Sequence, residues 1–218
     1  VLEAEGLKVA IVPQPDWHGD YRDFKKLGKP RLFFGIAPGC MDSMVNKYTA
    51  NKRLRSEDAY SPDGRHECRP EYPTIVYTKI LKSLYPDVPV VLGGIEASLR
   101  RLTHYDYWKD GLRKCILCDS GADMIIYGMG EKPIIQLCRE LQKGRDIHEI
   151  KDIPQTVWLS NEADIPGGIT DNDIVLHSHE ECLKNKIAQA ENFKHIEEES
   201  NMLHAHRLLQ AVDNVFAV

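Results

Sequence analysis

Residues 88–98 read VPVVLGGIEAS, and this stretch decides the fold class. Its first five residues form an apolar run, which is typical of a strand covered on both faces of a parallel sheet. Two glycines follow at the point where the chain must turn away from the sheet. Similar short runs alternate with longer helix-like segments, which predicts a Rossmann-like open parallel α/β sheet. We predict strands over residues 8–12, 31–36, 88–92, 124–127 and 156–159.

The segments between these runs carry helical patterns. Residues 74–85 place apolar side chains at four-residue spacing and precede Pro86, which ends a helix. Residues 48–73 are polar and rich in proline, so we expect a long excursion over the surface. Further helices are predicted over 109–119, 131–143 and most of 179–210.

The 218 residues suffice for one domain with an appendage. We predict a Rossmann-like domain over 1–160 and, over 161–218, a linker and a long helix. Residues 1–5 have the pattern of a helix end closed by Gly6, so we expect a piece of a longer protein whose first strand is missing. That strand would lie in the centre of the sheet, and its loss would leave two unpaired edges.

Composition argues against some classes of partner. Lys plus Arg total 28 and Asp plus Glu total 33, and the net charge of −5 argues against a nucleic-acid partner. No apolar run reaches the roughly 20 residues that cross a bilayer, so we expect no membrane partner. The sequence also has no secretory signal pattern, and we expect a cytoplasmic protein.

Glycine-rich loops follow three of the predicted strands, within 34–43, 90–98 and 127–131. Ligands in open α/β sheets bind beyond the carboxyl ends of the strands, so three such loops predict a ligand crevice, although each glycine is also explained by its turn. An arginine pair after the second loop suits a carboxylate or phosphate, or equally salt bridges to nearby acids. The candidate ligand-binding residues are Gly39, Asp42, Ser43, Gly93, Gly94, Glu96, Ser98, Arg100, Arg101, Gly128, Gly130 and Glu131, with Asn46 and Arg55 as further polar residues of the first loop.

The six cysteines include one close pair, Cys115 and Cys118. We predict that this pair lies on the helix over 109–119, whereas thioredoxin-type pairs open a helix after a strand. We therefore interpret both residues as buried structural thiols, with a thiol redox protein as the alternative. No three cysteines have the CxxxCxxC spacing that holds an iron–sulfur cluster.

Two histidine-containing stretches are candidates for function. Residues 16–19 read DWHG and resemble the start of the DxHxxG pattern of cobalamin proteins, which makes His18 a candidate cobalt ligand, although Tyr21 stands where the pattern has glycine. Residues 104–108 read HYDYW and suit a lid over a ligand or an interface with another domain. We favour the interface.

Longer stretches carry a family resemblance. Residues 85–98 and 121–131 resemble a strand and glycine loop of the cobalamin-binding-type domains that precede many radical S-adenosylmethionine (SAM) enzymes. The whole chain is similar to the YgiQ-type family of bacterial radical SAM proteins, and this resemblance rests on residues 13–17, 41–44, 46–50, 93–101 and 104–108.

The resemblance implies that these residues are the N-terminal accessory domain of a radical SAM enzyme. A catalytic barrel would follow residue 218 in the same polypeptide and hold the 4Fe–4S cluster and SAM, and no catalytic residue or metal ligand of that barrel lies in this chain. The resemblance leaves two interpretations of the domain open, a cobalamin binder and a related fold that has lost the cofactor. The alternative function is a stand-alone module that binds a corrinoid, nucleotide or anion without catalysis, and the substrate, small or macromolecular, is not specified by the sequence.

Overall fold

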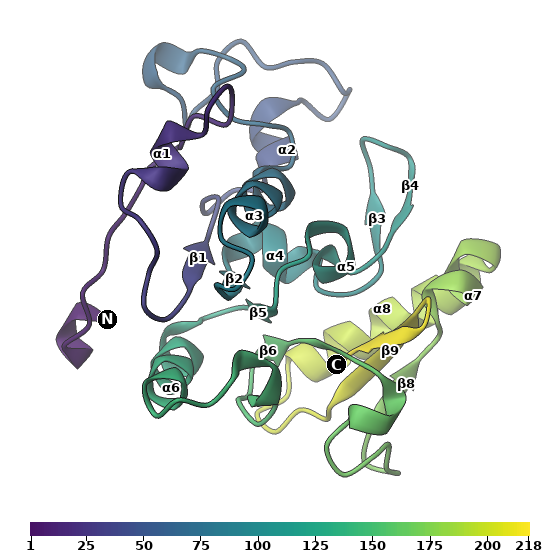
Figure 1. The fold of residues 1–218 in the computed structure, drawn as a ribbon. Helices are drawn as coiled ribbons and strands as arrows, with labels where there is room; N and C mark the ends of the chain where they lie inside the picture. The colour runs from purple at the N-terminus through teal and green to yellow at the C-terminus, as the bar shows by residue number, and fades with distance from the viewer.

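Four short strands form the first sheet of the computed structural model, which describes residues 1–218 (Figure 1). Their order is β1 (Phe34–Ile36), β2 (Val90–Leu92), β5 (Met124–Ile126) and β6 (Thr156–Val157). The pairs β1–β2 and β2–β5 are parallel, so the predicted α/β, Rossmann-like class is confirmed. Strand β6 runs antiparallel to β5, and Gln155 just before it takes a left-handed backbone conformation (φ 61°).

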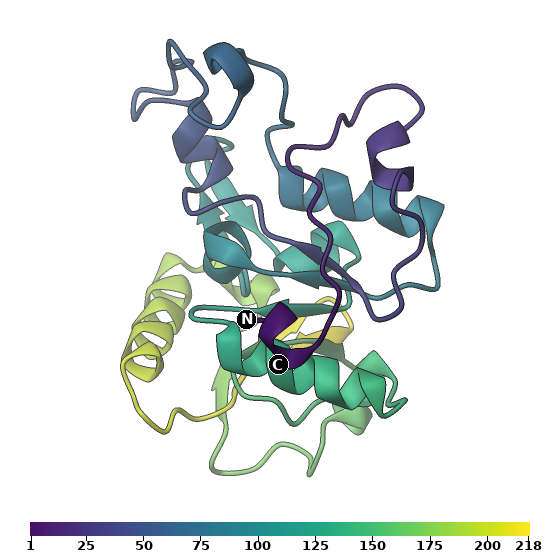
Figure 2. The ribbon, with the colours of Figure 1, turned by 90° about the vertical axis from the view of Figure 1, so that its left-hand side faces the viewer.

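Both faces of this sheet are covered, as the apolar runs predict. Val90, Leu92 and Ile125 point into a core shared with α3 (Pro73–Leu84) and α5 (Ile116–Ser120). The alternate residues, including Val91 and Met124, point into a second core shared with α6 (Glu131–Gln142). Figure 2 shows α3 above the sheet and α6 below it. The helices predicted over 74–85 and 131–143 are therefore confirmed.

The last third of the chain builds a second sheet, in the order β7 (Leu159–Ser160), β10 (Val215–Ala217), β9 (Leu208–Val212) and β8 (Ile174–Leu176). Helices α7 (His179–Lys184) and α8 (Lys186–Ser200) connect β8 to β9. The prediction of one long helix over most of 179–210 is wrong. Asn185 interrupts it, because its side chain caps α8 by accepting from the Ile187 amide at 2.9 Å. Residues 208–212 become a strand because β8 and β10 pair with them on both sides.

The remaining elements are short. They are helices α1 (Arg22–Lys25), α2 (Ser43–Lys47) and α4 (Gly94–Leu99), strands β3 (His104–Asp106) and β4 (Gly111–Arg113), and 3₁₀ turns at Glu3–Glu5, Pro62–Gly64, Ile147–Glu149 and Glu162–Asp164. Apart from one such turn and a single β-bridge, residues 48–73 have no regular structure before α3 begins. No helix combines the length and the apolar character that crossing a membrane requires.

Two predictions for the N-terminal half are wrong. Residues 8–12 are extended but pair with no strand, and the side chains of Val9 and Ile11 are 44% and 82% exposed. In Figure 2 this segment crosses the front of the molecule, on the β1 side. The first sheet is continuous from β1 to β6, so the two central unpaired edges expected of a missing strand are absent, and β1 forms an outer edge instead.

Candidate functional site

Helices α2 and α4 begin beyond the carboxyl ends of β1 and β2, and buried charges join them. Asp42 caps α2, because its carboxylate accepts hydrogen bonds from the Met44 amide at 3.0 Å and the Val45 amide at 3.4 Å. The other Asp42 oxygen pairs with the guanidinium of Arg100, just after α4. Both side chains are buried, so this pair ties the first loop to the second in a water-poor region.

A second buried contact joins the same two loops. The Ser43 hydroxyl donates to Oε2 of Glu96 at 2.6 Å, and Glu96 is only 1% exposed. Its other oxygen, Oε1, is buried without a hydrogen-bond partner. Burial raises the pKa of Glu96, although the Ser43 hydrogen bond and the charge of Arg100 oppose that rise. The site therefore holds a carboxyl group that its surroundings favour in the protonated form.

The glycines of these loops allow a close approach of backbone to backbone. Gly94 has a φ of +78°, and a Cβ placed there would lie 3.3 Å from the carbonyl oxygen of Gly39. Gly39 itself has a φ of +135°, a conformation that side chains rarely adopt. The Gly93 amide donates to the Ile36 carbonyl at 2.8 Å. The first and second loops therefore touch directly.

Ser98 joins the third loop to the second. Its hydroxyl donates to the Gly94 carbonyl at 2.8 Å and accepts from the Gly128 amide at 3.1 Å. Beyond this contact the third loop is open to solvent, since Met129 is 77% exposed and Glu131 is also exposed. Gly130 packs on the sheet so closely that a Cβ there would lie 2.9 Å from the Ile126 side chain.

Most of the predicted residues thus gather at one edge of the sheet, and Arg101 also links that edge to α8. Its guanidinium donates to the Ser98 carbonyl at 2.6 Å and to the Ser200 hydroxyl of α8 at 3.3 Å. It also lies over the Tyr127 ring, 4.8 Å from the centroid. Arg100 and Arg101 therefore face different partners. Arg100 forms a salt bridge to a nearby acid, Asp42, which is one of the two predicted roles of the pair.

Two buried charges at this edge were missed by the sequence analysis. Asp58 and Arg69 lie 3.7 Å apart, and the Asn46 amide donates to Asp58 at 2.6 Å. Arg69 also donates to the Pro38 carbonyl at 3.3 Å, within the first loop. Both charges belong to the polar segment 48–73, whose composition predicted only a surface excursion. Arg55, by contrast, is exposed and donates to the Val45 carbonyl at 2.9 Å.

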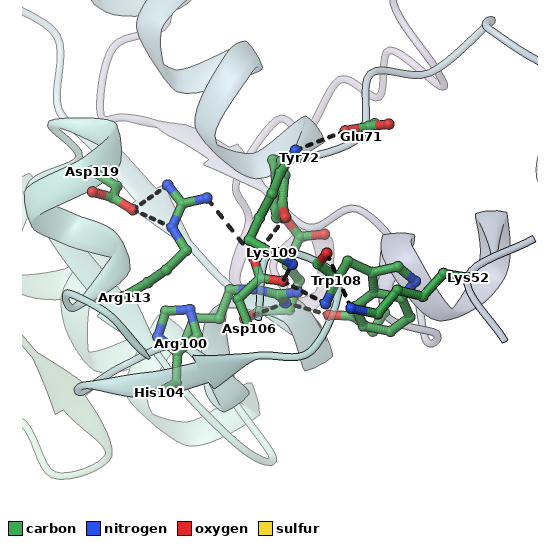
Figure 3. A network of polar contacts seen from close by, with 12 residues as sticks. Lys52, Glu71, Tyr72, Arg100, His104, Asp106, Trp108, Lys109, Arg113 and Asp119 are labelled. Carbon is green, nitrogen blue, oxygen red and sulfur yellow. Dashed lines mark hydrogen bonds and ion pairs between the residues drawn. The ribbon is translucent and has the colours of Figure 1, made fainter. Parts of the chain in front are cut away.

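The cluster over residues 104–108 forms the hairpin of β3 and β4, organised by Asp106 (Figure 3). Asp106 accepts from the Tyr72 hydroxyl at 2.6 Å and from the amides of Trp108 and Lys109 at 3.0 and 3.1 Å. The Tyr107 hydroxyl donates to the Ala50 carbonyl at 2.5 Å, which fastens the hairpin to the segment 48–73. Tyr105 and Tyr107 stay 55% and 43% exposed, and the interface of this cluster with another domain stays a prediction.

His104 stands on the same hairpin, beside Arg100 (Figure 3). Burial lowers its pKa to about 4, with the nearby charges of Arg100 and Arg113 adding to the effect and the Leu102 carbonyl opposing it. His104 is therefore neutral at pH 7.

The residues present do not fit an iron–sulfur cluster. All six cysteines are free, and no group of three or more His, Cys, Asp or Glu side chains is arranged to hold a metal ion. His18 pairs with Asp16, whose Oδ1 lies 3.0 Å from Nδ1, but both side chains are exposed and no hydrogen bond or ion pair joins them to the three loops. Cobalt ligation by His18 stays a prediction.

Comparison with protein families gives a match over the entire chain. The family model described as "Radical SAM N-terminal" matches residues 1–218. No solved structure matches the chain.

Curated relatives are close in sequence and much longer. A UPF0313 protein of Bacteroides thetaiotaomicron is 63% identical over 229 residues, covering 100% of this chain and 37% of that protein. A UPF0313 protein of Porphyromonas gingivalis is 61% identical over 216 residues, covering 97% of this chain and 33% of that protein. The UPF0313 protein YgiQ of Escherichia coli is 52% identical over 167 residues, covering 77% of this chain and 22% of that protein. The chain spans about a third of the length of the first two relatives.

Proposed function

The chain belongs to the Radical SAM N-terminal family, and from that premise we propose that residues 1–218 are the accessory domain of a cytoplasmic radical SAM enzyme. The greater length of the relatives supports a further, catalytic domain in the same polypeptide. That domain would hold the 4Fe–4S cluster and SAM. Six free cysteines in this chain suit a reducing compartment.

The carboxyl edge of β1, β2 and β5 is the surface that would face the catalytic domain. The observation that carries this proposal is the convergence of three loops, cross-linked by the Asp42–Arg100 and Ser43–Glu96 contacts. Four large apolar side chains are exposed on the segments that leave this edge, at Met41, Ile95, Leu99 and Met129. Exposed apolar groups on a rigid scaffold suit a protein interface.

The same edge would also present a small ligand to the catalytic domain. The backbone of the glycine loops leaves Met129 and Glu131 open to solvent, while the paired charges beneath hold the loops in place. A ligand that binds the native protein alone raises its stability. Thermal unfolding of the full-length protein with cobalamins, SAM and nucleotides in turn would identify the ligand class, and no shift with any of them would remove this part of the proposal.

The activity is tested with anaerobically prepared full-length protein. We expect reductive cleavage of SAM to 5′-deoxyadenosine, measured by chromatography. Leu99→Glu would place a charge on the proposed interface, so it should slow this reaction without removing iron. The matched control is Leu203→Glu, because Leu203 is 93% exposed and lies outside the edge. Equal losses in both variants, or none in either, would contradict the proposed interface, and absence of SAM cleavage in the parent protein would contradict the proposed activity.

A further inference from the structure

The cysteine pair lies at a strand-to-helix junction, not within the helix predicted over 109–119. That helix prediction is correct only for its end, which is α5, because Gly111–Arg113 pairs with His104–Asp106 as the second strand of the hairpin. Cys115 then caps α5, and Cys118 lies inside it. Thioredoxin-type pairs open a helix after a strand, and this pair does so.

The backbone brings the two cysteines within reach of a disulfide. The Cys118 amide donates to the Cys115 carbonyl at 3.0 Å, and this hydrogen bond closes a tight turn. A turn of this kind keeps the first and fourth α-carbons closer than about 7 Å. Disulfides form where the α-carbons are roughly 4.4 to 6.8 Å apart, so the bond needs little movement of the backbone.

The two thiols differ in access. Cys115 is 0% exposed and belongs to the apolar core shared by α3 and α5. Cys118 is only partly buried, packed against the edge of that core. Of the two residues, Cys118 is therefore the more accessible to an incoming molecule.

The pKa values of the two thiols differ in the same sense as their exposure. Contact with the Cys115 thiol lowers the pKa of Cys118, opposed by partial burial and by the carboxylates of Asp119 and Asp213. The same contact, together with burial, raises the pKa of Cys115. The more accessible sulfur is thus also the better source of thiolate, which is the nucleophile in disulfide exchange.

We propose that Cys115 and Cys118 form a redox-active dithiol that takes small-molecule disulfides as its substrate class. The Cys118 thiolate attacks one sulfur of the substrate disulfide, forming a mixed disulfide and releasing one thiolate. The Cys115 sulfur, on losing its proton, then attacks Sγ of Cys118 and releases the second thiolate. The domain loses two electrons and two protons and gains the Cys115–Cys118 bond, and the substrate leaves as two thiols.

The test uses the reduced full-length protein incubated with oxidised glutathione, then freed of glutathione, alkylated under denaturing conditions and digested with trypsin. The peptide over 115–139 carries both cysteines together with Cys138, because Pro133 blocks cleavage after Lys132. We expect this peptide to carry one alkyl group, on Cys138, and an internal disulfide. In the reduced protein, iodoacetamide should modify Cys118 at least about tenfold faster than Cys115, since alkylation needs an accessible thiolate.

Serine variants separate the two roles. Cys115→Ser should trap a glutathione adduct on Cys118, Cys118→Ser should form neither the adduct nor the disulfide at this pair, and Cys138→Ser should behave as the parent. Circular dichroism checks folding, and Cys115→Ala replaces the serine variant if that one unfolds. Full alkylation of both residues in the oxidised parent protein would overturn the proposal, and so would an adduct that forms on Cys115 while Cys118 stays free.

Discussion

The carboxyl edge of the first sheet has two parts that differ in their surroundings. The buried part, Asp42, Ser43, Glu96 and Arg100, consists of charged and polar side chains that contact one another and exclude water. The open part, residues 128–131, presents backbone and exposed side chains to solvent. The comparison shows that polar residues at a predicted site can have different roles. Those of the buried part hold the loops together, and those of the open part stay available to a ligand or another domain.

The largest effect is expected from breaking the buried ion pair. Arg100→Ala would leave the Asp42 carboxylate buried without its partner, which costs about 3–5 kcal/mol of unfolding free energy. Urea unfolding of the protein measures this loss. Arg22→Ala is the control, because Arg22 and its partner Asp20 are both exposed, and it should change the unfolding free energy by less than about 0.5 kcal/mol. Equal effects of the two variants would contradict a stabilising role of the buried Asp42–Arg100 pair.

Acid should destabilise the fold through His104, which lies beside Arg100 of the buried part. Its pKa in the folded protein is about 4, below the ordinary value of 6.5, so the unfolded chain binds the proton more tightly. The stability contribution is therefore complete above pH 6.5 and is lost as the pH falls towards 4. The shift corresponds to about 3 kcal/mol. Stability measured against pH should show this loss, and His104→Gln should remove that part of the slope. An unchanged slope in the variant would contradict a neutral, buried His104.

A smaller effect is expected when the hydroxyl contact is removed. Ser43→Ala takes away the hydrogen bond to Glu96 and leaves a second unpartnered carboxyl oxygen, at a cost of about 1–3 kcal/mol. The pKa of Glu96 is already raised, and its stability contribution falls as the pH rises above its ordinary value of 4.5. Loss of the Ser43 hydrogen bond raises this pKa further, so the variant should be more strongly destabilised at pH 8 than at pH 5. The opposite trend would contradict a Ser43 hydroxyl that favours the ionised form of Glu96.

The smallest effect on stability is expected in the open part. Met129→Ala removes a side chain that is 77% exposed, so the unfolding free energy should change by less than about 0.5 kcal/mol. The same substitution should still alter thermal shifts by added ligands or the rate of SAM cleavage in the full-length protein. A large loss of stability would show that this loop is part of the structural core.

The sequence predicted well where local pattern and burial agree. Val90, Val91 and Leu92 are apolar throughout and lie between two covered faces, so a strand was evident. Residues 8–12 have a similar pattern but pair with no neighbouring strand, and composition does not reveal whether such a neighbour exists. Residues 109–119 have helical spacing, yet pairing of Gly111–Arg113 with His104–Asp106 overrides it.

For the candidate site, the sequence located the loops but not their contacts. Glycines directly after β1, β2 and β5 mark the carboxyl edge because only such turns let backbones approach closely. The pairing of Asp42 with Arg100 joins residues 58 positions apart, and Asp58 and Arg69 come from a segment that looks entirely solvated. Long-range pairing of charges leaves no local pattern to detect.

We propose that this domain serves a radical SAM enzyme without supplying ligands to its cluster. The direct measurement is the iron and sulfide content, with the visible absorption, of the anaerobic full-length protein and of its Cys40→Ser and Cys118→Ser variants. We predict a 4Fe–4S cluster in the parent protein and the same content in both variants. A parent protein without a cluster, or a cluster lost on either substitution, would contradict the account.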